Sequence, residues 1–252
     1  GTWRPSRATE GAAASGVSAV PPEGRITAMR AFVDADGWMR EAFLKSGLSQ
    51  LQYHERSRVE SNGVTTVVTD ITGGKAAGWT HTVVTSRRAD GAYVQRHLLE
   101  PFGTFPQLPR LGLTCRLPAG FENVAYYGRG PDENYVDRCT GSFLGIYRTT
   151  VTDLYVPYVR PQDCGYRTDV RWLEITDRAG RGWCFEMDRP FHFSALHHTV
   201  DDLDRARDAV TQIDEEGVLL MRAEHQAEDV FKQKDAAAEK ARVLLAAATR
   251  NK

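Results

Sequence analysis

Paired β-rich segments joined by glycine-containing turns constrain this fold more than any other feature of the sequence. "YHERSRVES" and "VTTVVTDIT" flank Asn62-Gly63, a dipeptide that accepts the positive φ angles of a tight hairpin, and a second hairpin is expected at Asp90-Gly91. Further β-rich segments follow at "LGLTCRL", "ENVAYYG", "LGIYRTTV", "DVRWLEIT" and "GWCFEMD", and the turn "DRAG" separates the last two. With almost no helix between them, these segments predict antiparallel sheets packed face to face, and not a parallel α/β domain.

A short helix is expected before the β-rich region and further helix after it. "GWMREAFLKSGLSQLQ" has apolar residues near helical spacing and Gly47 as a stop, while "DDLDRARDAV" predicts one or two helical turns. The apolar positions of the first helix are Trp38, Ala42, Leu44 and Leu48.

A long C-terminal helix is expected over residues 225–252, which are rich in Ala, Glu, Lys and Gln and contain no Gly or Pro. Its apolar face is narrow, so the helix suits packing against its own domain or docking onto another protein subunit. The expected docking residues are Val230, Phe231, Ala237, Ala241 and Leu244.

The first 36 residues are expected to form an extended arm. The initial stretch is rich in Ala, Ser, Gly and Pro and has one acid, Glu10, in its first 22 positions, so it buries too little apolar surface to fold alone. The arm is expected to lie free or on a partner protein. Its basic, acid-poor character also fits the tail end of an organelle transit segment, which makes a mitochondrial location one possibility for an intracellular protein. The expected domains are the arm at 1–36, a β-sandwich at 37–224 and the helix at 225–252.

Charge and cysteine content restrict the expected partners. The chain has 32 basic and 33 acidic residues, so no global charge draws it to nucleic acid or to anionic membranes. No stretch approaches the roughly 18 apolar residues that span a bilayer, and we expect a soluble protein without membrane insertion. The four cysteines lie far apart without zinc-ligand spacing, so we expect buried free thiols and no metal or cofactor.

The stretch "YYGRGPDENYVDR", residues 126–138, concentrates glycine, proline and charged side chains between two β-rich segments. Gly128, Gly130 and Pro131 are expected to form a loop there. The glycines do not form a nucleotide-binding fingerprint, because the third glycine, the following helix and the βαβ frame are missing. The candidates for a structural corner or a weak sugar site are Arg129, Asp132, Glu133, Asn134, Asp137 and Arg138.

Three motifs within residues 108–206 carry a resemblance to a known family. They are "GRGPDENYVDR", "YVPYVRPQDCGYRTDVRW" and "PFHFSAL". In this order and spacing they resemble the C-terminal domain of family 2 β-galactosidases, also called the β-galactosidase small chain. "GWMREAFLKSGLSQLQ" is similar to a more distant, earlier segment of that family. The resemblance implies a galactose-mutarotase-like supersandwich, in agreement with the strand pattern.

The resemblance also limits the chemistry expected of this chain. Retaining glycosidases need two carboxyl groups about 5 Å apart, and in this family both come from a (β/α)₈ barrel of about 250 residues, for which this sequence has no room. Glu133 and Asp137 lie four positions apart beside Arg129 and Arg138, so we expect ion-paired turn residues and no catalytic residue.

Both ends of the chain depart from the family pattern. After "DLDRA" the family continues with a strand and a Gly-rich loop containing Asp-Ser-Trp that reaches toward substrate, whereas this chain reads "VLLMRAEHQAEDVFKQKDAAAEK". At the other end, only "WRPS" is similar to the family's Trp-Arg-Ala-Pro-type entry segment.

Sugar epimerisation and sugar binding remain alternatives because the implied fold is shared with mutarotases. Epimerisation needs an acid and a base across the sugar ring, and His197 or His198 with Glu174 or Glu186 are the candidates. Adjacent histidines on a strand point to opposite faces, which disfavours their joint use. Trp79, Trp172 and Trp183 are candidate stacking platforms for a bound sugar, with core packing as their ordinary role.

The favoured interpretation is a non-catalytic accessory or scaffold subunit that binds other protein subunits through its arm and its C-terminal helix. The first alternative is the small chain that completes a split β-galactosidase. The second is a carbohydrate-binding or aldose-epimerase-like module.

Overall fold

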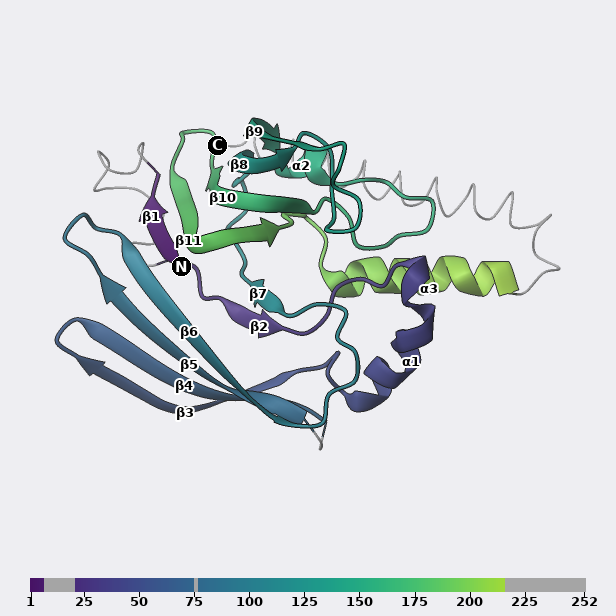
Figure 1. Ribbon diagram of the computed structural model, residues 1–252, viewed down its shortest axis with the longest axis horizontal. Coiled ribbons are helices and arrows are strands. Elements are labelled where there is room, and N and C mark those ends of the chain that lie inside the picture. Colours follow the sequence, from purple (N-terminus) through teal and green to yellow (C-terminus); the bar gives the residue numbers. More distant parts are fainter. Residues whose placement is uncertain (7–20, 75–76, 216–252) are drawn as a thin grey trace, which may run out of the picture. The chain divides into compact units, whose positions relative to one another are not determined.

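The computed structural model describes residues 1–6, 21–74 and 77–215, and it confirms an all-β, antiparallel fold with a helix after the last strand (Figure 1). Residues Gly1–Leu203 form one compact unit, and the described residues from Asp204 onward belong to a second. The strands are β1 (Thr2–Pro5), β2 (Arg25–Thr27), β3 (Gln52–Ser61), β4 (Val64–Gly73), β5 (Ala77–Arg87), β6 (Tyr93–Gly103), β7 (Gly112–Thr114), β8 (Asn123–Gly130), β9 (Phe143–Thr150), β10 (Arg167–Thr176) and β11 (Gly182–Phe193). The helices are η1 (Asp34–Asp36), α1 (Gly37–Ser46), α2 (Val151–Leu154) and α3 (Val200–Glu215).

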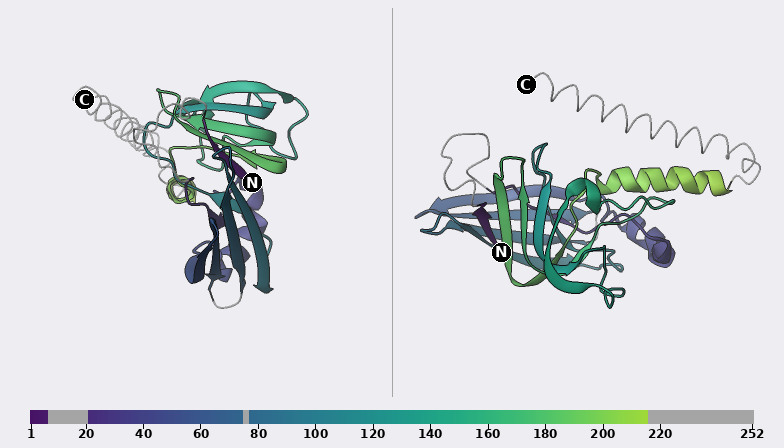
Figure 2. Two further views of the ribbon diagram at one scale, coloured as in Figure 1. Left: turned by 90° about the vertical axis from the view of Figure 1, so that its left-hand side faces the viewer. Right: turned by 90° about the horizontal axis from the view of Figure 1, so that it is seen from above.

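Nine strands form one sheet in the order β3-β4-β5-β6-β1-β11-β10-β8-β9, and β2 pairs with β7 in a small second sheet. The strands β3 to β6 and the strands β8 to β11 form two halves, and the short strand β1 joins them by pairing with β6 on one side and β11 on the other (Figures 1 and 2). Among the described strands, β3 and β9 are therefore the edges of the large sheet.

The predicted hairpins are confirmed. Asn62 and Gly63 have φ angles of 50° and 74° and connect β3 directly to β4, as a tight turn with positive φ requires. Gly91 has a φ angle of 81° in the connection between β5 and β6, and Gly180 has 76° in the turn before β11. Local turn chemistry thus sets the register of three strand pairs.

The predicted first helix is confirmed as α1, and Gly47 ends it with a φ angle of 77°. Of the apolar positions expected for this helix, Leu48, just beyond its end, is buried, but Trp38, Ala42 and Leu44 are exposed. The helix instead buries Met39 and Phe43, one turn apart. Phe43 meets Phe32 edge to face, with 6.0 Å between ring centroids, so the segment before the helix determines which face is covered.

The described parts of residues 1–36 contribute strands to the domain, which differs from the arm expected there. Trp3 in β1 lies 4.7 Å from Phe185 and 6.3 Å from Trp183 between ring centroids, and its indole Nε1 donates to Gln95 Oε1 at 3.0 Å. Long-range pairing compensates for the low apolar content of this segment. Residues 7–20, on which the transit-segment interpretation depends, lie outside the described residues, and that interpretation stays a prediction.

Each half of the large sheet has its own hydrophobic core. The first core lies on β4 and β5 and is completed by the segment from β2 to α1; the second lies on β8, β10 and β11 and is completed by α2. The buried members are Ile26, Ala28, Phe32, Phe43, Leu48, Ile71, Ala77 and Trp79 in the first, and Val124, Tyr126, Val151, Leu154, Val170, Phe191 and Phe193 in the second.

Two histidines on β5 and β6 form a stacked pair. His81 Nε2 lies 3.0 Å from His97 Nδ1, with ring centroids 5.3 Å apart, and burial lowers the pKa of both imidazoles, that of His97 to about 4. At least one of the two imidazole rings must be neutral, so that its unprotonated nitrogen can accept a hydrogen bond from the other ring.

This pair predicts loss of stability in acid. Because the folded-state pKa values lie below the usual value of about 6.5, the stabilisation is fully present above pH 6.5 and falls as the pH drops toward 4. The midpoint of urea unfolding should be lower at pH 5 than at pH 7, and His97→Gln should reduce this difference. An unchanged pH dependence in the variant would contradict the assignment.

Cys115, Cys139, Cys164 and Cys184 are free thiols, but only Cys164 is buried. No helix in the described part of the chain is long and apolar enough to cross a membrane. The expected docking residues between 230 and 244 lie outside the described residues, so the docking role of the C-terminal helix stays a prediction.

Candidate functional site

Residues 129–138 form the segment that we call the corner, and Asn134 lies at its centre. It is fully buried, and its Nδ2 donates to the carbonyl oxygens of Arg129 at 3.1 Å and Asp132 at 3.0 Å. Its Oδ1 accepts from the backbone N–H of Thr168 at 3.0 Å and from the Thr168 hydroxyl at 2.5 Å. The amide therefore fastens the turn after β8 to the start of β10.

Glu133 is the most enclosed acid of the corner, with its side chain 8% exposed. Its Oε1 accepts from Arg138 Nη2 at 2.5 Å and from the Tyr158 hydroxyl, and its Oε2 accepts from the backbone N–H of Gly165 at 2.8 Å. The predicted ion pair with Arg138 is confirmed. Three donors from separate segments occupy this carboxylate, as in a structural anion site.

The other charged residues of the corner are arranged differently from the expectation. Arg129 does not pair with an acid of the corner: its Nε donates at 2.5 Å to Asp169 on β10, and this hydrogen bond holds the pKa of Asp169 below its usual range. Asp132 and Asp137 are exposed, and Asp137 forms no ion pair with a described residue. Asp169 could not be identified from the sequence as the partner of Arg129, because the two residues lie 40 positions apart.

The two glycines expected in the loop belong to strand β8 instead, and the turn begins at Pro131, after a cis peptide bond. A Cβ on Gly128 would lie 2.8 Å from Val170 Cγ2, and one on Gly130 would lie 2.4 Å from the Tyr126 hydroxyl. Close packing of β8 against its neighbours, and not loop conformation, therefore explains these glycines.

An aromatic stack beside the corner was not found from the sequence. Tyr135, Tyr166 and His192 stack with centroid distances of 5.1 and 5.6 Å, and the Arg110 guanidinium lies 4.6 Å above the Tyr166 ring. Asp163 is buried beneath them; its Oδ2 accepts from Arg110 Nη2 at 2.7 Å and from the Tyr135 hydroxyl at 3.3 Å. Burial raises the pKa values of Asp163 and Tyr135, against the opposing effect of Arg110.

The candidate acid and base residues for epimerisation are not brought together. His197 pairs with Glu122, not with a predicted glutamate, at 2.9 Å between Nε2 and Oε2; Glu122 also accepts from the N–H of Thr152 in α2. His198 packs against Tyr155, with centroids 5.0 Å apart. Glu186 lies on β11, 3.7 Å from Arg4, and Glu174 lies on β10.

The three candidate tryptophans separate by burial. Trp79 is buried and packs against Phe105. Trp183 is buried and packs against Trp3 and Tyr93. The described fold therefore leaves neither ring a face for a sugar. Trp172, on β10, is half-buried.

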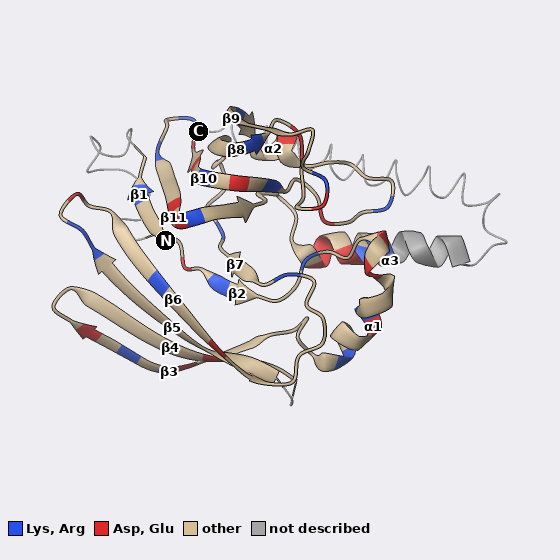
Figure 3. Cartoon of the chain, viewed as in Figure 1, with Lys and Arg blue, Asp and Glu red and all other residues tan. Residues whose placement is uncertain are grey.

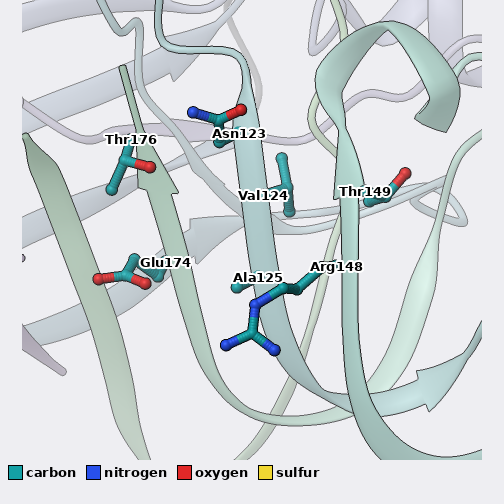
Figure 4. Close-up of a pocket in the computed structure, with 7 residues that line it drawn as sticks. All are labelled: Asn123, Val124, Ala125, Arg148, Thr149, Glu174 and Thr176. Carbon is teal, nitrogen blue, oxygen red and sulfur yellow. The ribbon is translucent and has the colours of Figure 1, made fainter. Parts of the chain in front are cut away.

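A shallow hollow of about 260 Å³ lies on strands β8, β9 and β10 (Figure 4). Arg148 extends from β9 beside the small side chain of Ala125, and Glu174 lies on the other neighbouring strand. Its lining of Asn123, Val124, Ala125, Arg148, Thr149, Glu174 and Thr176 can hydrogen-bond a small polar molecule, but it contains only one carboxyl group. The residues of the corner do not contribute to it.

The geometry of the corner favours a structural role. Its enclosed carboxylate and amide are engaged by protein donors and acceptors, whereas a retaining glycosidase needs two carboxyl groups facing the substrate. No group of three or more potential metal ligands occurs among the described residues. Whether the exposed acids Asp132 and Asp137 contact a sugar stays a prediction.

Comparisons with known proteins agree with the motifs. The sequence profile described as β-galactosidase small chain matches residues 9–228. The β-galactosidase of Priestia megaterium is 38% identical over 115 residues, which cover 46% of this chain and 11% of that enzyme. The β-galactosidase of Lactobacillus delbrueckii subsp. bulgaricus is 45% identical over 73 residues, which cover 29% of this chain and 7% of that enzyme. The β-galactosidase of Vibrio vulnificus is 29% identical over 150 residues, which cover 59% of this chain and 13% of that enzyme. The matched part of the chain thus spans about a tenth of the length of these relatives.

Proposed function

The chain belongs to the β-galactosidase small-chain family, and on this basis we propose that it is a non-catalytic accessory domain that supports a larger protein assembly. The observation that carries the proposal is the saturation of Glu133 by Arg138, Tyr158 and Gly165. A carboxylate held by three donors is a poor nucleophile, because attack on a sugar would require it to give up those hydrogen bonds.

Other charged and polar residues of the described domain are used in the same way. Asn134 joins the corner to β10, Arg129 pairs with Asp169, and Glu122 accepts from the start of α2. The first two contacts hold the C-terminal end of β8 to β10, and the third holds the segment before β8 to α2. Contacts of this kind fix the positions of surface segments, which suits a domain that supports another protein.

The proposal predicts that the purified chain does not hydrolyse a chromogenic β-galactoside. No turnover should be measured above that of a mock preparation from a host lacking β-galactosidase. The matched control is Glu133→Gln, which should leave this background unchanged. Turnover that persists through purification and falls in Glu133→Gln would overturn the proposal.

The assembly itself is tested on the endogenous protein. Native mass spectrometry after gentle purification should give a mass larger than that of the chain, with a defined stoichiometry of companion polypeptide. Recovery of the chain by itself, at the mass of one copy, would contradict an accessory role.

A second candidate function is that of the small chain completing a β-galactosidase active site, favoured because the matched relatives are described as β-galactosidases. This function predicts that the chain restores activity when added to a β-galactosidase from which the matched domain has been deleted. A purely supporting domain would bind without restoring turnover, so the two functions give different results.

A further inference from the structure

The two free edges of the large sheet differ in how they are protected. At one edge, β3 is exposed along its length, has a register shift between Glu55 and Ser57, and carries a series of charges (Figure 3). Arg56 pairs with Asp70 and Arg58 pairs with Glu55. Charged side chains and bulges are the usual means of preventing edge-to-edge pairing of strands.

At the other edge, β9 has no bulge and carries a single charged residue. It pairs with β8 over eight consecutive residues without a register shift, and Arg148 is its only charged residue. Phe143 and Ile146 are 73% and 60% exposed, and Leu144 is also exposed. No described strand pairs with the outer side of β9. A regular, largely apolar edge strand with a single charge is a template for pairing with another strand.

We propose that the β9 edge pairs with the same edge of a second copy of this chain, to form a symmetric dimer with a sheet continuous across both copies. A two-fold interface places one surface patch against itself, so the patch must be self-complementary. Antiparallel pairing centred on Ile146 meets this condition. It sets Ile146 against its copy, Leu144 against Arg148, and Phe143 against Thr149.

The charge of Arg148 is compatible with this arrangement. In the register centred on Ile146, the two Arg148 residues lie four residues apart along the paired strands, or roughly 13 Å at 3.3 Å per residue. Each Arg148 instead places its aliphatic part over Leu144 of the other copy, with the guanidinium free to reach water. Centring on Tyr147 would halve that separation, which favours Ile146 as the midpoint.

Analytical ultracentrifugation of the full chain tests the proposal. The wild-type chain should be dimeric, and Ile146→Lys should raise the dimer dissociation constant at least tenfold, because two lysines would meet at the centre of the interface. The matched control is Val59→Lys on β3, where Val59 is 58% exposed, and this variant should dimerise like the wild type. Thermal melting of both variants checks that each remains folded.

The register is tested with Ile146→Cys. Side chains directly opposite in an antiparallel pair have Cβ atoms about 4.5–5.5 Å apart, so a short thiol cross-linker should give a covalent dimer. Val59→Cys should give no more than the wild type, which reports the background from the four native cysteines.

Three results would overturn the proposal. The first is a wild-type chain that stays monomeric at its highest soluble concentration, and the second is a dimer that Ile146→Lys leaves intact. The third is a monomer that Ile146→Lys destabilises, which would place another segment of the same chain over β9.

Discussion

Replacing Asn134 by alanine is expected to lower the free energy of unfolding by about 3–5 kcal/mol. The side chain is fully buried, and its removal would leave the carbonyl oxygens of Arg129 and Asp132 and the N–H of Thr168 without the hydrogen bonds it makes. Each stranded buried group costs about 1–3 kcal/mol. Urea unfolding followed by tryptophan fluorescence measures the loss.

Asn123→Ala is the control for this prediction. Asn123 is exposed and its Nδ2 makes one hydrogen bond, to the carbonyl oxygen of Asp177 at 2.9 Å. Its loss should cost less than about 1 kcal/mol. Equal effects of the two substitutions would show that Asn134 does not fasten the corner to β10.

Glu133→Ala is expected to cost about 3 kcal/mol, because it would leave Arg138, the Tyr158 hydroxyl and the Gly165 N–H without their shared acceptor. Arg138→Ala should cost less, about 1 kcal/mol, since its side chain is 53% exposed and water can replace part of the interaction. Both variants should lower the melting temperature.

Asp137→Ala is the control for the Glu133 and Arg138 variants. This acid is exposed four positions from Glu133, and removing it should change stability by less than about 0.5 kcal/mol. If the Glu133 and Arg138 variants kept full stability while a sugar affinity was lost, the corner would be a binding site and not a structural element.

The features that could be predicted from the sequence are those determined by neighbouring residues. Asn62-Gly63 needs positive φ angles wherever it occurs, so the hairpin between β3 and β4 followed from the dipeptide alone. The end of α1 at Gly47 could also be predicted, because glycine readily adopts the positive φ angle that ends a helix. The pairing of Glu133 with Arg138 spans only five positions and could also be anticipated.

The features that could not be predicted depend on residues far away in the chain. The partner of Arg129 lies 40 positions on, and that of His197 lies 75 positions back. The buried face of α1 is selected by Phe32, which packs on Phe43, and helical periodicity alone does not distinguish this face from the one containing Trp38. The buried position of Asn134 could not be predicted, because it depends on the hydrogen bonds of this residue with Thr168 on β10.

The position of β1 between the two halves of the sheet has a consequence for folding kinetics. Its contacts with Gln95 span 92 and 94 residues, and the hydrogen bond from the Ser6 hydroxyl to Gly180 spans 174. Pairings of such sequence separation form slowly, because a long loop must close before any contact is gained. On the ribosome, β1 is synthesised before all of its partners, and β11 is the last strand of the sheet to emerge. We therefore expect two separately collapsed halves to accumulate first, and the insertion of β1 to be the slow step that unites them.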